Sequence, residues 1–142
     1  MAAKEKRFIV VSVGDTLGFG YNEHEIPQLL KLGEAYSPDH LVMNRTGFLA
    51  HFRTTKANVR KAFSLVANAE KLRDTDKRFT ELKIGVAEGK LVGEFDFLGN
   101  IKKDGIGLLG DAIVRAVLQE QSPLAYKPQL SSLAETLHVR IP

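Results

Sequence analysis

Cysteine is absent from the 142 residues of this chain. Its absence excludes a disulfide framework, a thiolate zinc site and a cysteine nucleophile. Long apolar runs are absent as well. The first run, residues 8–13, contains Ser12 and stops at Gly14, which is too short for a secretory signal or for a membrane span of about 18 residues. We therefore expect a cytoplasmic protein without a membrane partner.

The chain also lacks a large excess of charge of one sign. It contains 20 Lys and Arg residues and 17 Asp and Glu residues, which gives a net charge of +3. Three surplus charges make a weak field, unlike the dense basic stripe of a nucleic-acid-binding protein. The isoelectric point near 9.2 motivates nucleic-acid binding as a third hypothesis, which a steep salt dependence of binding would reveal. We expect no nucleic-acid partner.

What is present is the composition of an ordinary globular domain, 44% hydrophobic and 26% charged. The length suits a single domain spanning residues 1–142. Apolar periodicity predicts alternating strands and helices. The expected strands are 7–13, 41–43, 48–52, 81–87, 90–97 and 137–141, and the expected helices are 25–37, 55–72 and 109–117.

The connections refine this pattern. Residues 44–47 are expected to join the two strands of a hairpin, Asn22 to cap the first helix, and Thr54 or Thr55 to cap the second. The order β-α-β-β-α-β predicts an α+β sandwich in which helices cover one face of a mostly antiparallel sheet.

Few residues form a recognisable catalytic or metal-binding motif. The four histidines have no helical metal-ligand spacing. The informative segment is 14–20, GDTLGFG, in which Asp15 could hold a hard cation while the backbone N–H groups of Gly18, Phe19 and Gly20 bind phosphate. Taken alone, the segment is more often a turn that Asp15 caps.

Four segments together resemble the class III nucleotidyl (adenylate/guanylate) cyclase catalytic domain. They are 15–19 (DTLGF), 45–52 (RTGFLAHF), 83–93 (KIGVAEGKLVG) and 109–114 (LGDAIV), in the family's order. The resemblance covers residues 7–120 and implies a ferredoxin-like βαββαβ core, with residues 121–142 as a C-terminal extension.

The resemblance also assigns roles to single positions. Family members hold two Mg²⁺ ions with two aspartates; Asp15 matches the first, and Thr46 stands at the second. The transition-state Asn and Arg positions are occupied by Val114 and Leu118. The base-selecting Lys position is Val42, and the position of its Asp partner is Gly107.

These replacements imply a catalytically inactive domain that works as a regulatory or protein-interaction module, forming a homodimer or a heterodimer with another protein. Residual nucleotide binding would involve Asp15 as a metal ligand, with Mg²⁺ as the cofactor only if nucleotide binds. The alternative is an active nucleotidyl cyclase that uses Asp111 or Arg115 in displaced roles.

Overall fold

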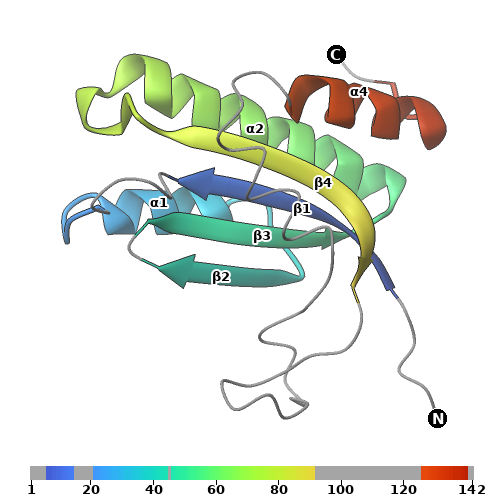
Figure 1. Ribbon diagram of the computed structural model, residues 1–142, viewed down its shortest axis with the longest axis horizontal. Coiled ribbons are helices and arrows are strands. Elements are labelled where there is room, and N and C mark those ends of the chain that lie inside the picture. Colours follow the sequence, from blue (N-terminus) through green and yellow to red (C-terminus); the bar gives the residue numbers. More distant parts are fainter. Residues whose placement is uncertain (1–5, 15–20, 45, 92–125, 141–142) are drawn as a thin grey trace, which may run out of the picture.

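The computed structural model describes residues 6–14, 21–44, 46–91 and 126–140 (Figure 1). Their elements are, in chain order, β1 (Lys6–Gly14), α1 (Ile26–Glu34), β2 (His40–Asn44), β3 (Gly47–Arg53), α2 (Lys56–Thr75), the short 3₁₀ helix η1 (Lys77–Phe79), β4 (Lys83–Leu91) and α4 (Tyr126–Thr136). The expected order β-α-β-β-α-β is confirmed.

The four strands form one antiparallel sheet in the order β2-β3-β1-β4. Strand β1 lies between β3 and β4, so that Val10 pairs with His51 on one side and with Ala87 on the other. Its apolar run suits this central position, because side chains on both faces of β1 are buried. The strand order and the element order together confirm the predicted ferredoxin-like α+β fold.

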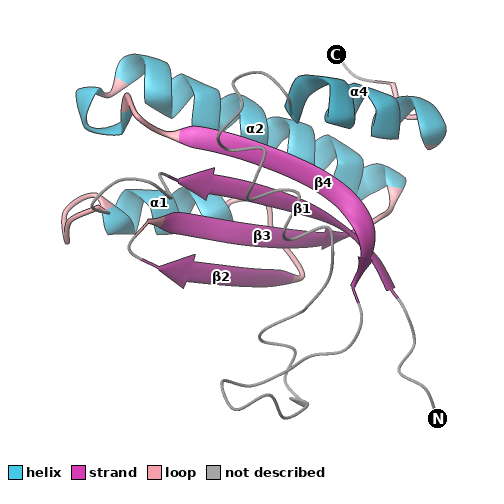
Figure 2. Ribbon diagram, in the orientation of Figure 1, coloured by secondary structure: helices cyan, strands magenta, loops and turns pink. Residues whose placement is uncertain are grey.

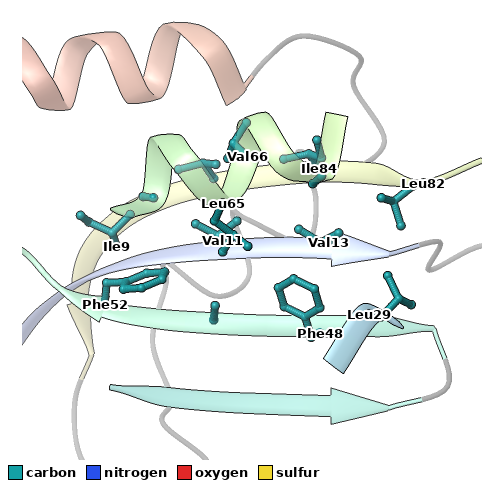
Figure 3. Packing of buried hydrophobic residues seen from close by; sticks show 14 of the residues in the cluster. Ile9, Val11, Val13, Leu29, Phe48, Phe52, Leu65, Val66, Leu82 and Ile84 are labelled. Atoms are coloured by element: carbon teal, nitrogen blue, oxygen red, sulfur yellow. The ribbon is translucent and has the colours of Figure 1, made fainter. Parts of the chain in front are cut away.

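Helices α1, α2 and α4 each contribute to a single hydrophobic core on one face of the sheet, which we call the first face (Figure 2). Figure 3 shows the side chains that meet there. They include Ile9, Val11 and Val13 of β1, Phe48 and Phe52 of β3, Leu29 of α1, and Leu65 and Val66 of α2. Complete burial of such a side chain contributes about 1.5–3 kcal/mol to the free energy of unfolding.

Short polar interactions fix where the helices begin. Thr55 caps α2, as predicted, and its Oγ1 accepts a hydrogen bond from the backbone N–H of Asn58 at 3.2 Å. Helix α1 begins after Glu25, with Pro27 in its first turn, where no backbone donor is needed. Asn22 is not the N-cap; its Oδ1 accepts hydrogen bonds from the backbone N–H groups of His24 and Glu25, forming the turn before the helix.

Two predictions about strand boundaries were wrong. The hairpin connection is shorter than 44–47, because Asn44 and Gly47 already pair with each other. Residues 81–87 and 90–97 were expected to be separate strands around Glu88 and Gly89. Instead β4 continues through both residues to Leu91, because β1 is long enough to pair with all of it. Residues 92–97 and the expected helix 109–117 lie outside the described part of the chain.

The predicted strand 137–141 was also wrong for its described residues, 137–140, which contain no strand. Helix α4 instead ends in a turn at His138, whose φ is +55°. The N–H of His138 donates to the carbonyl oxygen of Glu135, and that of Val139 to the carbonyl oxygen of Ala134 at 2.8 Å. This is the Schellman pattern of helix termination, which satisfies the last carbonyl groups and turns Val139 back into the core.

Candidate functional site

The tip of the β2–β3 hairpin lies directly against the end of β1. Gly14 pairs with Gly47, and Thr46 occupies the turn just before Gly47, where it is half-buried. A Cβ atom on Gly14 would collide with the carbonyl oxygen of Thr46, and one on Gly47 would collide with that of Val13. Gly47 also has a φ of +144°, which side-chain-bearing residues rarely adopt. Glycine at both positions therefore allows this close approach.

This register places Gly14, the residue before Asp15, beside the hairpin tip that carries Thr46. Asp15 follows Gly14 in the sequence but lies outside the described residues, as do Gly18, Phe19, Gly20, Val114 and Leu118. The structure thus places Gly14, which precedes Asp15, opposite Gly47, which follows Thr46. Of the two positions assigned to base selection, Val42 is described and Gly107 lies outside the described residues.

The residues at the hairpin tip do not fit a two-magnesium site. Thr46 and the two glycines offer hydroxyl and carbonyl oxygens but no carboxylate, and Mg²⁺ beside a triphosphate requires carboxylates for charge compensation. Among the residues that the structure describes, no group of three or more His, Cys, Asp or Glu side chains could hold a metal ion. No catalytic step through Mg²⁺ follows from this site.

The sheet face opposite the core, which we call the second face, carries the remaining predicted position. Val42 is half-buried on β2 and pairs with Leu49. Alternation along the strands places the same face at Phe8, Val10 and Ser12 of β1, His40 of β2, His51 of β3 and Ala87 of β4. Phe8, Val10, Ser12, His51 and Ala87 are all buried. The predicted base-selecting position therefore lies on a largely buried face of the sheet.

The second face also holds a pair of histidines that sequence reasoning missed. His40 pairs with His51, and their ring centroids are 6.3 Å apart. Metal-ligand spacing along a helix does not reveal this pair, because it forms between two strands. The expected hairpin contained the signal, because pairing Met43 with Phe48 in a regular antiparallel hairpin also pairs His40 with His51.

His51 is in an unusual electrostatic environment. Its side chain is 1% exposed, and neither ring nitrogen has a hydrogen-bond partner among the described residues. The pKa of His51 is lowered from 6.5 to about 4. Burial is the main cause, and the positive charge that His40 can carry is the second. The imidazole of His51 is therefore neutral at neutral pH and retains a lone pair on one nitrogen.

Two hollows on the helix side of the sheet contain none of the predicted site residues. One, of about 570 Å³, lies between α1 and α2 beside Leu32 and Leu72. The other, of about 250 Å³, lies beside α4, Arg7 and Glu88. Within the described part of the chain, no helix is long and apolar enough to cross a membrane.

Comparison with known proteins identifies solved structures but no sequence relatives. No protein-family model matches the chain, and no curated protein matches it either. The guanylyl cyclase Cya2 aligns with a TM-score of 0.60 and 16% identity, covering 100% of this chain and 83% of the cyclase chain. A bacterial light-regulated adenylyl cyclase aligns with a TM-score of 0.55 and 17% identity, covering 85% of this chain.

A second structure of a bacterial light-regulated adenylyl cyclase gives a TM-score of 0.52 at 18% identity, covering 86% of this chain. This chain spans only 41% and 42% of the two light-regulated chains. At these identities the comparisons show the fold alone, and that fold is the one that the four sequence segments predict.

Proposed function

We propose that this chain, which has the fold of class III nucleotidyl cyclases, is a catalytically inactive domain that acts by binding another protein chain. The observation that carries the proposal is Thr46 at the tip of the β2–β3 hairpin. This tip lies against the end of β1 through the Gly14–Gly47 pair. The cyclase resemblance assigns the second metal-binding aspartate to this position.

The chemistry of phosphoryl transfer explains why this replacement matters. Two carboxylates neutralise the metal ions that position a triphosphate, and a threonine hydroxyl supplies one weak oxygen without charge. The resemblance also aligns Val114 and Leu118 with the Asn and Arg that stabilise the transition state. An arginine in such a role contributes roughly 10³–10⁵ in rate. By this alignment the chain lacks one of the two metal-binding aspartates and both of the residues that stabilise the transition state.

The same substitutions favour a role in protein association. Cyclase sites form where two domains meet head to tail, and Val114 and Leu118 replace polar residues that face the partner in that arrangement. Apolar side chains there favour a dry contact over a polar active site. The apolar residues Val114 and Leu118 are consistent with a regulatory domain. Such a domain would pair with a second copy of itself or with another cyclase-like chain.

A pair of variants at one position tests the loss of the metal site. The purified chain with ATP or GTP and Mg²⁺ or Mn²⁺ is expected to make no cyclic nucleotide. Thr46→Asp is expected to strengthen Mg²⁺-dependent nucleotide binding by roughly tenfold, because it restores a carboxylate, whereas Thr46→Asn adds an amide of similar size without charge. Equal binding by the two variants would contradict the assignment of Thr46. Turnover by the wild-type chain that Asp15→Ala abolishes would refute inactivity.

Sedimentation analysis tests the association. We expect the wild-type chain to form a dimer whose dissociation constant increases in Leu118→Arg, because a charge would be buried in the contact. Circular dichroism of Leu118→Arg should be unchanged. A wild-type chain that remains monomeric at every concentration would contradict self-association, and so would a Leu118→Arg variant that associates as strongly as the wild type.

A further inference from the structure

The two histidines of the second face lie side by side and differ in their exposure. His51 is 1% exposed in the middle of β3, flanked across the sheet by Val10 and His40. His40 is half-buried near the start of β2, with its ring centroid 6.1 Å from that of Phe8. The two imidazole rings are 6.3 Å apart at an interplanar angle of 60°. One ring is therefore held by packing, and the other is reachable from the edge of the sheet.

No hydrogen bond among the described residues offsets the cost of burying the polar ring of His51. Both of its ring nitrogens are buried without a hydrogen-bond partner there. A buried polar group left in this state costs about 1–3 kcal/mol, and such a group calls for an explanation such as a bound ion. An apolar side chain would fill the position without that cost, since Val10, which pairs with it on the same face, is apolar.

We propose that His40 and His51 form a binding site for a divalent transition-metal ion of borderline softness, with Zn²⁺ as the representative ion. Imidazole nitrogen is a preferred ligand of such ions and a poor one for Mg²⁺. An ion bonded to both rings at about 2.0–2.1 Å places their centroids roughly 5–6 Å apart. The observed separation of 6.3 Å is slightly longer than this range, so the two rings would move closer together on binding an ion.

The coordination sphere of such an ion needs more than two ligands. The described residues supply only two ligands, since no group of three metal-binding side chains occurs among them. The remaining ligands would come from water, from a small ligand or from residues outside the described part of the chain.

This site is separate from the hairpin tip. The hairpin tip follows Asn44 at the end of β2, whereas His40 begins the same strand. The proposal therefore does not depend on whether the chain is catalytically active, and it involves none of Asp15, Thr46, Val114 or Leu118.

Zn²⁺ titration of the metal-free chain by isothermal calorimetry tests the proposal. One ion is expected per chain, and His40→Ala should weaken binding by about tenfold or more. His24→Ala is the matched control, because His24 is exposed and lies apart from the pair; it should bind as the wild type does. His51→Phe, which keeps a planar ring without nitrogen, should also lose binding, and circular dichroism checks its fold.

Co²⁺ provides a second readout, because its visible absorption reports nitrogen ligation directly. A spectrum that appears with the wild type and with His24→Ala, but not with His40→Ala, would support the site even if His51→Phe failed to fold. Absence of binding by the wild type would refute the proposal. Equal affinity of the wild type and His40→Ala would refute it as well, as would loss of binding in His24→Ala alone.

Discussion

At the residue scale, His51 has the strongest conflict between side-chain chemistry and environment in the described part of the chain. Its neighbours across the sheet are Val10 and His40, and burial lowers its pKa from 6.5 to about 4. In the unfolded chain the imidazole is hydrated and takes up a proton near its ordinary pKa. The folded protein therefore binds fewer protons than the unfolded chain between these two values.

This difference predicts how stability depends on pH. The free energy of unfolding rises with pH wherever the unfolded state binds more protons, so the His51 contribution is fully present above pH 6.5 and is lost as the pH falls toward about 4. The loss amounts to about 3 kcal/mol. Urea unfolding with a chelator present, from neutral to acidic pH, measures it.

A matched pair of variants isolates the His51 contribution to this pH dependence. His51→Leu should flatten the pH dependence by that amount, because leucine fills a similar space without a titrating group. His24→Leu removes an exposed histidine and should leave the slope unchanged. If the free energy of unfolding depended on pH in the same way in His51→Leu and in the wild type, burial would not be lowering the pKa of His51.

At the element scale, the β2–β3 hairpin depends on the close contact between its tip and β1. Gly47 has a φ of +144°, and a Cβ atom there would lie 2.5 Å from the Cα of Gly14. The neighbouring atoms belong to the backbone, so they cannot rotate away as a side chain can. The β2–β3 hairpin therefore has no room for a side chain at position 47 unless the backbone shifts.

Gly47→Ala is accordingly expected to lower the free energy of unfolding by roughly 1–3 kcal/mol, through strain at the backbone. Gly33→Ala is the control, because its Cβ would meet Cδ1 of Leu41 at 3.0 Å, the end of a side chain that can move. Helix propensity also favours alanine at Gly33 by about 1 kcal/mol. Chemical denaturation of both variants measures the difference. If Gly47→Ala lowered the free energy of unfolding no more than Gly33→Ala does, the contact at the hairpin tip would not be rigid.

At the scale of the whole molecule, the C-terminal segment closes the core that the βαββαβ elements begin. Helix α4 packs against β4 and α2 (Figure 1). Ala134 of α4 and Val139 beyond it belong to the core, with exposures of 4% and 8%. Residues 126–140, which belong to the segment that the sequence suggested as an extension, therefore pack with the rest of the fold.

Val139→Asn tests this integration. It buries an amide of similar size among apolar side chains and should lower the free energy of unfolding by about 1–3 kcal/mol. Arg140→Asn changes the exposed neighbour and should remain within about 0.5 kcal/mol of the wild type. Urea unfolding followed by circular dichroism measures both. Equal stability of the two variants would mean that the tail is not part of the cooperative fold.

Prediction from sequence succeeded where the information is local. The apolar run of β1 and the helical spacing from Val59 to Leu72 are patterns among near neighbours in the chain, and the Thr55 cap depends on a residue three positions away. The identity of Thr46 could also be interpreted without coordinates, because the absence of a carboxylate is a property of the side chain.

Prediction failed where an element is completed by a distant partner. Glu88 and Gly89 look like a turn, yet they extend β4 because residues of β1 hydrogen-bond to them. The tail after His138 looks like a strand, yet the helix termination directs Val139 into the core.

The sequence by itself thus determined the order of the elements, the fold class and the absence of a carboxylate at position 46, since each follows from side-chain identity, from short-range periodicity or from the order of the four segments. Only the tertiary structure decided which side chains share a face. It brought His40 and His51 together and buried His51 without a partner in the described residues, because strand pairing and burial depend on contacts between segments far apart in the chain.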